Sequence, residues 1–199
     1  MDEPPFGQLV IISGPSGSGK TTVVRELLQR CGDLPLELSV SATTRPSRTG
    51  ETHGVDYHFL SLEEFQQRQA EGKFLEWCEV FGRGHLYGTL AEPVYTSRQA
   101  GKWVILEIDV EGAMKVVEQL PDAVTIFDHP GSMEELAQRL RGRGTESESA
   151  IQRRLEVARR ELEFSKRYRH CVVNDEVGAT VDKLNTILNR YRTNHSPPN

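Results

Sequence analysis

The sequence lacks the features of a membrane protein, a disulfide-rich secreted protein or a general nucleic-acid binder. No apolar run approaches the roughly 20 residues that a membrane helix needs. There are only three cysteines, far apart, so we expect neither a disulfide framework nor a zinc site. Acidic residues outnumber basic ones by 29 to 24, which argues against nucleic acid as a partner, because that function favours a basic surface. The opening MDEPPFG has no basic or apolar region typical of a signal peptide, so we expect a cytoplasmic protein.

Short apolar runs alternate along the chain with helix-like segments. The apolar runs favour buried strands and occupy residues 8–14, 36–40, 103–109, 123–128 and 171–174. The helix-like segments cover residues 20–31, 62–72, 111–120, 132–144, 147–167 and 178–192. This alternation predicts an α/β fold, in which helices flank a parallel sheet.

Two segments, residues 41–97 and about 139–156, do not follow this alternation. Apart from its one expected helix, the first is rich in Gly, Thr, Arg and aromatic residues, a texture that favours short strands and turns. We interpret both segments as insertions over the C-terminal edge of the sheet, where such folds bind ligands. The prediction is a single domain over residues 1–199, with its core at about 6–40, 98–138 and 157–192.

A glycine-rich motif, GPSGSGKT at residues 14–21, satisfies the pattern G-x-x-x-x-G-K-[ST]. Glycines let the backbone curl around a phosphate with its N–H groups pointing inward. Lys20 would then reach the β- and γ-phosphates, and the Thr21 hydroxyl would bind Mg²⁺. A flexible Gly/Ser turn is the alternative, but the motif lies between a predicted strand and a predicted helix, as phosphate binding requires. We therefore predict a nucleoside-triphosphate site.

Asp109 ends the apolar run WVILEID, where a Walker-B-type aspartate would organise the metal ion. The alternative is a helix N-cap or a turn residue at the end of a strand. Residues 109–112 also fit the D-x-x-G pattern of GTP hydrolases. The chain has no N-K-x-D motif for reading guanine, which removes most of the support for that class.

The stretch SVSATTRPSRTGE, residues 39–51, combines hydroxyl side chains with two arginines around a proline. Arginine suits phosphate because its planar guanidinium can donate two parallel hydrogen bonds. Pro46 stiffens the segment and so lowers the entropy lost when Arg45 and Arg48 bind one target. A solvated polar loop is the alternative for this stretch taken alone.

Glu76 offers a carboxylate that could distinguish guanine from adenine. Guanine presents N1–H and N2–H₂ as adjacent donors, and one carboxylate can accept from both. Adenine has an acceptor at N1, which would leave the carboxylate unsatisfied at a loss of about 1–3 kcal/mol. Tyr57 and Tyr87 add hydroxyl groups from the same part of the sequence.

Together these motifs resemble the guanylate kinase family. The stretches GPSGSGKTT, SVSATTRPSRTGE, GVDYHF, FLEW, LYGT, ILEIDVEGA, RLRGRGTES and VVND occur in that family's order and cover roughly residues 8–190. The resemblance implies a P-loop kinase fold with a GMP-binding lobe at about 41–97 and a helical lid at about 139–156. It also implies transfer of a phosphoryl group from ATP to GMP or dGMP with Mg²⁺, giving ADP and the diphosphate.

The resemblance assigns roles to the matching positions. Those that would bind ATP are Gly14, Pro15, Ser16, Gly17, Ser18, Gly19, Lys20, Thr21, Thr22 and Asn174, although Asn174 could equally be a turn residue. Those that would bind GMP are Ser41, Glu76 and Thr89 at the base, Arg45, Arg48, Tyr57 and Tyr87 at the phosphate, and Glu107 nearby. The catalytic residues would be Lys20, Arg45, Arg139, Arg143 and Arg154, and the metal ligands Thr21 and Asp109.

The remaining arginines of the lid region, Arg141, Arg153, Arg159 and Arg160, fit a solvated helix face. The same fold allows two other functions. A non-catalytic protein-binding module would lose the lysine or the arginines, which this chain keeps, and a kinase for another small molecule would not need Ser41 and Glu76. The sequence leaves the oligomeric state open.

Overall fold

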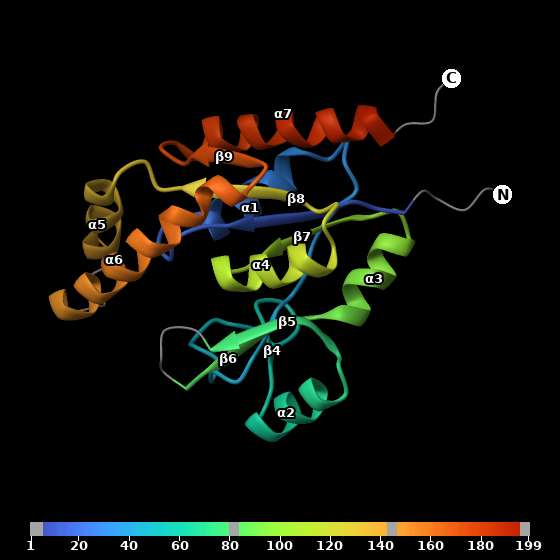
Figure 1. Cartoon of the computed structure of the whole chain (residues 1–199), viewed down its shortest axis with the longest axis horizontal. Helices are drawn as coiled ribbons and strands as arrows, with labels where there is room; N and C mark the ends of the chain where they lie inside the picture. Colours follow the sequence, from blue (N-terminus) through green and yellow to red (C-terminus); the bar gives the residue numbers. More distant parts are fainter. Residues whose placement is uncertain (1–5, 80–83, 143–146, 196–199) are drawn as a thin grey trace. The chain divides into compact units, whose positions relative to one another are not determined.

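The computed structural model describes residues 6–79, 84–142 and 147–195 (Figure 1). Its chain divides into two compact units. The first unit contains the described residues up to Ile11 together with those of Pro35–Val124. The second contains Ile12–Leu34 and the described residues from Thr125 onward. Within the described residues, no helix is both long enough and apolar enough to cross a membrane.

The larger sheet has the strand order β2-β7-β1-β8-β9. Its strands are β1 (Leu9–Ser13), β2 (Leu36–Leu38), β7 (Trp103–Glu107), β8 (Val124–His129) and β9 (His170–Val173). The pairs β2–β7 and β8–β9 are parallel. Every residue of β1 is buried, and β7 and β8 are buried except at their last residue, as expected for parallel strands covered on both faces. The predicted α/β class and the positions of these strands are confirmed.

The smaller sheet belongs to the first unit and has the order β4-β3-β6-β5. Its strands are β3 (Ala42–Thr43), β4 (His58–Phe59), β5 (Phe74–Glu79) and β6 (Leu86–Leu90). The predicted helix at 62–72 is α2 (Leu62–Ala70), whose N-terminus carries a capping box made by Ser61 and Glu64. Its Phe65 is fully buried and stacks on Phe74 of β5, with ring centroids 4.4 Å apart.

Two further helices of the first unit are α3 (Ala91–Gln99) and α4 (Val110–Gln119). The sequence predicted α4 but not α3. Pro93 and the β-branched and aromatic residues 94–96 have low helix propensity, although proline is tolerated in a first turn because no intrahelical bond is lost there. α3 packs against β7, and the carbonyl of Arg98 accepts a hydrogen bond from the Gly7 amide at 2.7 Å.

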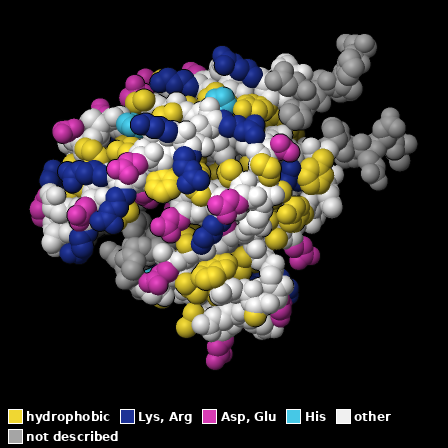
Figure 2. Space-filling model, in the orientation of Figure 1, with side chains coloured by type: hydrophobic (Ala, Val, Ile, Leu, Met, Phe, Trp, Pro, Cys, Tyr) yellow, Lys and Arg dark blue, Asp and Glu magenta, His cyan; other side chains and the backbone are white. Residues whose placement is uncertain are grey.

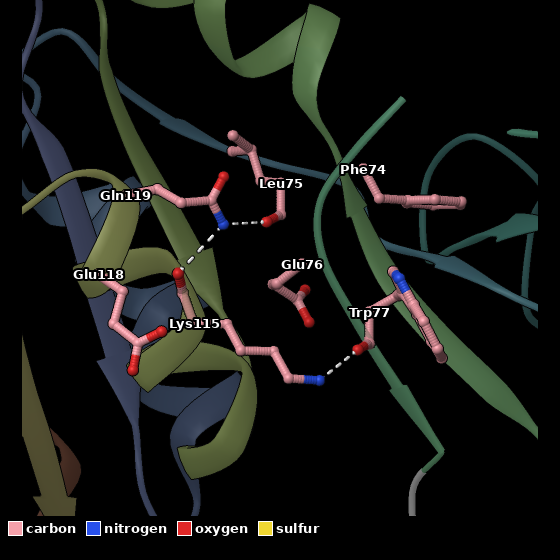
Figure 3. Close-up of a pocket in the computed structure, with 7 residues that line it drawn as sticks. All are labelled: Phe74, Leu75, Glu76, Trp77, Lys115, Glu118 and Gln119. Atoms are coloured by element: carbon pink, nitrogen blue, oxygen red, sulfur yellow. Dashed lines mark hydrogen bonds between the residues drawn. The ribbon is translucent and has the colours of Figure 1, made fainter. Parts of the chain in front are cut away.

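Helix α4 covers the free edge of β5, the last strand of the smaller sheet (Figure 3). Lys115 Nζ donates to the Trp77 carbonyl and Gln119 Nε2 to the Leu75 carbonyl, both at 2.7 Å. These bonds satisfy carbonyls that an edge strand would otherwise leave unpaired. Residues 74–77, Lys115, Glu118 and Gln119 line a pocket of about 380 Å³ at this junction.

The second unit consists of helix pairs and the strand ends that they cover. Its helices are α1 (Lys20–Arg30), α5 (Met133–Gly142), α6 (Glu148–Glu163), the short 3₁₀ helix Phe164–Arg167 and α7 (Val177–His195). α1 packs on α7, with Arg30 Nη2 paired to Asp182 Oδ1 at 2.8 Å. α5 packs on α6 through Leu136, Leu140 and Ile151. The predicted helices in this part of the chain are therefore confirmed.

Charged side chains of both signs are interspersed over the face shown in Figure 2. The chain has 24 basic and 29 acidic residues, so neither sign is in large excess.

Candidate active site

The phosphate loop connects the end of β1 at Ser13 to the start of α1 at Lys20. Gly14 lies against β8, where a Cβ atom on it would come within 2.3 Å of the Asp128 carbonyl oxygen. Gly19 is the N-cap of α1 and has a φ of 109°, a conformation that residues with a side chain rarely adopt. The close approach and the left-handed turn explain why the loop needs glycine at these two positions.

Lys20 folds back over the loop that precedes it. Its Nζ donates to the carbonyl oxygens of Gly14 at 2.6 Å and Pro15 at 2.9 Å. The ammonium group is thus held above the turn whose backbone amides would surround a phosphate. Thr21 and Thr22 follow in the first turn of α1, which contains no acidic residue to oppose an anion.

Two arginines from neighbouring helices contact this loop. Arg139 of α5 donates from Nη1 to the Ser18 carbonyl at 2.6 Å and from Nη2 to the Asn174 carbonyl at 2.5 Å. Arg154 of α6 donates from Nη2 to Ser16 Oγ at 2.6 Å. The structure therefore brings two of the predicted catalytic arginines to the phosphate loop. Arg143, the third arginine expected in the lid, lies outside the described residues.

The other lid-region arginines are exposed, as the sequence predicted, at positions 141, 153, 159 and 160. Arg141 forms an ion pair with Glu148 at 2.6 Å, and this hydrogen-bonded pairing lowers the pKa of Glu148 to about 2. Both side chains are about half exposed, so the pair contributes little to stability.

Asn174 and Asp128 form a buried polar group behind the phosphate loop, and each is only 3% exposed. Asn174 Nδ2 donates to the Ser18 carbonyl at 3.0 Å and to Asp128 Oδ2 at 3.3 Å. Ser18 Oγ also donates to Asp128 Oδ2, at 2.5 Å. Asn174 thus contacts the loop itself, while its predicted contact with adenine stays a prediction.

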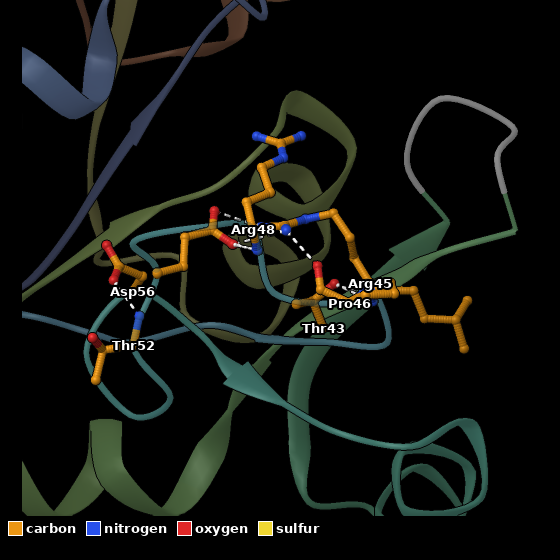
Figure 4. A network of polar contacts seen from close by, with 8 residues as sticks. Thr43, Arg45, Pro46, Arg48, Thr52 and Asp56 are labelled. Atoms are coloured by element: carbon orange, nitrogen blue, oxygen red, sulfur yellow. Dashed lines mark hydrogen bonds and ion pairs between the residues drawn. The ribbon is translucent and has the colours of Figure 1, made fainter.

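The first unit holds a second cluster of predicted residues, centred on Arg45 (Figure 4). The Arg45 guanidinium donates from Nη1 and Nη2 to the two carboxylate oxygens of Glu51, each at 2.9 Å. It also lies over the rings of Tyr57 and Phe59, at 5.2 and 5.6 Å from their centroids. The bonds to Glu51 and then to Tyr87 raise the pKa of Arg45 against the effect of burial.

The neighbours of Arg45 include three more predicted residues. The rings of Tyr57 and Tyr87 meet edge to face, with centroids 6.0 Å apart. Burial, followed by the nearby charge of Glu107, raises the pKa of Tyr57, so its hydroxyl keeps its proton. Arg48 is exposed, and its backbone amide donates to Glu51 Oε2 at 2.7 Å. Glu51 therefore fixes both the side chain of Arg45 and the backbone at Arg48.

Glu76 and Thr89 face each other across the β5–β6 pair. Thr89 Oγ1 donates to Glu76 Oε1 at 2.7 Å, and Glu76 is only 5% exposed. Burial raises the pKa of Glu76 to about 7, with a further contribution from the charge of Asp109. Ser41, also predicted at the base, is partly buried beside β3, and its carbonyl accepts from the His58 amide at 2.9 Å.

Asp109 is the N-cap of α4. This is the role that the sequence offered as the alternative to metal binding. Its Oδ1 accepts from the Gly112 amide at 2.7 Å, and its Oδ2 accepts from the Cys78 thiol at 2.9 Å. The predicted role of Asp109 in metal binding stays a prediction. Among the described residues, no group of three or more His, Cys, Asp or Glu could hold a metal ion on its own.

The sequence and fold of the chain are similar to those of known proteins. A family model described as guanylate kinase matches residues 7–191, nearly the whole chain. The chain belongs to the guanylate kinase family.

Several guanylate kinases are similar to the chain over most of their length. Those of Rhodopirellula baltica and Desulfitobacterium hafniense are 56% and 50% identical; the alignments cover 92% of this chain and 87% and 89% of the relatives. The crystal structure of guanylate kinase from Anaplasma phagocytophilum is 32% identical with a TM-score of 0.76, covering 94% of this chain and 86% of that one. TT1252 from Thermus thermophilus, at 15% identity and a TM-score of 0.50, resembles it in fold alone.

Two residues that contact the predicted guanylate kinase site were missed by sequence reasoning, Glu51 and Asp128. Glu51 ends the quoted stretch SVSATTRPSRTGE, and its carboxylate six residues from Arg45 could have suggested a pair. Asp128 comes at the end of an apolar run. Asp109 was identified as a candidate because it holds the same kind of position, but Asp128 was not. A polar residue at the end of a buried parallel strand was the available signal for Asp128.

Proposed function

We propose that this guanylate kinase family member transfers the γ-phosphoryl group of ATP to GMP, and also to dGMP, giving ADP and the nucleoside diphosphate. The observation that carries the substrate assignment is the buried Glu76, held by Thr89 in a chain that belongs to the guanylate kinase family. A buried carboxylate costs free energy unless donors satisfy it. The N1–H and N2–H₂ groups of guanine are two such donors, and adenine cannot supply both.

The donor nucleotide binds at the phosphate loop in this proposal. Residues 14–22 surround its phosphates with backbone amides, and Lys20 exchanges its bonds to the loop carbonyls for bonds to the β- and γ-phosphates. Asn174 supports the site from behind through Ser18. Because the first turn of α1 contains no acidic side chain, the positive end of the helix dipole faces the anion unopposed.

The acceptor binds in the first unit. Arg45 is a preorganised phosphate ligand, because Glu51 and the rings of Tyr57 and Phe59 already fix its guanidinium. Arg48, Tyr57 and Tyr87 complete the phosphate site, while Ser41, Glu76 and Thr89 contact the base and Glu107 lies near the nucleotide. An arginine whose orientation is set before binding loses little conformational entropy when the phosphate arrives.

Catalysis requires positioning and charge stabilisation rather than a side-chain nucleophile. Arg139, Arg154 and Arg143 neutralise charge that spreads over the transferred phosphoryl oxygens, and helices α5 and α6 act as a lid that keeps water away from it. Mg²⁺ bound with ATP would neutralise charge on the phosphates, and the residues that would offer it oxygen ligands are Thr21 and Asp109. Hydroxyl and carboxylate oxygens are donor types that Mg²⁺ prefers, although both Asp109 oxygens already accept hydrogen bonds, from the Gly112 amide and the Cys78 thiol.

We propose that the reaction takes place in the cytoplasm. All three cysteines are described and free, which fits a reducing compartment.

A coupled assay for ADP formation tests the function directly. Wild-type protein with Mg²⁺, ATP and GMP should form ADP and GDP in equal amounts. Lys20→Ala should lower kcat on the order of 10³-fold or more, because it removes a cation from the transferring phosphates. Turnover with another acceptor but none with GMP would refute the substrate assignment.

A further inference from the structure

Ser18 is buried and firmly held within the phosphate loop. It is fully buried, and it makes three hydrogen bonds to side chains from outside the loop. Its hydroxyl donates to Asp128 Oδ2 at 2.5 Å, while its carbonyl accepts from Asn174 Nδ2 at 3.0 Å and from Arg139 Nη1 at 2.6 Å. Arg139 and Asn174 already belong to the site described above, but Asp128 has no assigned role.

Asp128 determines how two of these three bonds are made. Its Oδ2 accepts from both Ser18 Oγ and Asn174 Nδ2, so the carboxylate fixes which end of the Asn174 amide faces Ser18. With Nδ2 turned this way, the amide can donate to the Ser18 carbonyl. Burial raises the pKa of Asp128, whereas the Ser18 bond and the charge of Lys20 act in the opposite direction.

The orientation of the Ser18 carbonyl affects the backbone amide that follows it. In a planar trans peptide the C=O and N–H groups point in opposite directions. Because Asn174 and Arg139 hold the Ser18 carbonyl, the Gly19 N–H is aimed away from them. Gly19 is the N-cap of α1, where backbone N–H groups are available to an anion.

We propose that Asp128 is a positioning residue for the ATP phosphates, which acts through Ser18 and Asn174 to hold the backbone amides of the phosphate loop in their binding orientation. This inference rests on the proposed function, because it deepens the role of the same phosphate loop. Asp128 itself does not touch the nucleotide. Its negative charge is offset by Lys20 and Arg139, and the donors on its carboxylate make its burial tolerable.

Asp128→Asn and Ser18→Ala test the two ends of the contact. The asparagine keeps the size of the side chain and one acceptor oxygen, but it removes the negative charge that strengthens the hydrogen bonds from Ser18 and Asn174 to Oδ2. Ser18→Ala removes the bond to the carboxylate altogether. Losing a hydrogen bond to a charged group should lower kcat/KM for ATP by about 10- to 100-fold in Ser18→Ala, and losing its charge should lower it in the same direction in Asp128→Asn. The KM for GMP at saturating ATP should change by less than about twofold, since uniform damage to the fold would affect both substrates.

The double variant shows whether the residues act together. If Asp128 works through Ser18, the double variant should lose clearly less than the product of the two single losses. Asp122→Asn removes the same charge from an exposed position and should match the wild type. Binding of a fluorescent ATP analogue without any acceptor should weaken in the same order as kcat/KM for ATP.

Wild-type kcat/KM for ATP in both Asp128→Asn and Ser18→Ala would overturn the inference, and so would equal losses for ATP and GMP or fully additive losses. Should Asp128→Asn fail to fold, Ser18→Ala decides alone, because it removes the same bond from the loop side. The analogue-binding measurement separates this test from that of the proposed function. If the wild type did not phosphorylate GMP, the effect of Asp128 on binding at the phosphate loop would still be measured.

Discussion

Glu76→Gln should make the protein more stable at pH 8 while impairing its recognition of GMP. The buried carboxylate has a pKa of about 7, raised by burial, against an ordinary value of 4.5. The folded protein therefore binds a proton at Glu76 that the unfolded chain has released between pH 4.5 and 7. The free energy of unfolding falls as pH rises through this window, by about 3 kcal/mol in total. Glutamine cannot ionise, so the variant avoids this loss.

The same substitution should damage the base site. Glutamine can still accept from Thr89, but its amide offers one acceptor and one donor where guanine presents two donors. We expect kcat/KM for GMP to fall by roughly 10- to 200-fold at pH 8. In the wild type, the KM for GMP should rise by about tenfold as pH falls from 8 to 6, because the carboxylate that guanine needs is protonated below about 7.

Urea unfolding at pH 5 and pH 8 checks the stability prediction, and initial rates with varied GMP at saturating ATP check the recognition. Glu118→Gln, an exposed change on α4, is the matched control and should alter neither quantity. A stability difference between Glu76→Gln and wild type that is the same at pH 5 and pH 8 would refute the assigned pKa. Unchanged GMP kinetics in the variant would refute the role in base recognition.

Substitutions at three other positions test separate parts of the account. Arg45→Lys keeps the charge but loses the paired bonds to Glu51, so the KM for GMP should rise about tenfold, measured by initial rates; an unchanged KM would contradict the phosphate role. Arg139→Ala should raise the KM for ATP and lower the unfolding free energy by about 1–3 kcal/mol in urea titrations, because two carbonyls lose a charged donor. Asp109→Ala should cost about 1 kcal/mol of stability through the lost N-cap, whereas Asp109→Ser should restore stability but not kcat. Wild-type kcat in Asp109→Ser would show that Asp109 is a cap alone.

The sequence predicted the larger sheet and most helices because these elements have strong local patterns. Continuous apolar runs such as LVIIS indicate strands buried on both faces, and the structure confirms them. Helix α3 was missed because Pro93 and the following β-branched residues lower its intrinsic propensity, while packing against β7 stabilises it. Local propensity could not reveal a contact that the tertiary fold supplies.

The residues of the candidate site were predicted through motifs, but the residues that hold them in place were not. Lys20, Arg45 and Glu76 belong to short patterns with a clear chemical use. Asp128 meets Ser18 across 110 residues of sequence, so no local pattern connects the two. Such a contact exists only because β1 and β8 are neighbours in the sheet.

Comparison of GMP, IMP and AMP as acceptors with saturating MgATP tests the central claim most directly. IMP keeps the N1–H of guanine but lacks the 2-amino group, and AMP has an acceptor at N1. If Glu76 reads both donors, kcat/KM should fall by about 10- to 100-fold from GMP to IMP and further for AMP. Equal kcat/KM values for GMP and AMP would contradict the account.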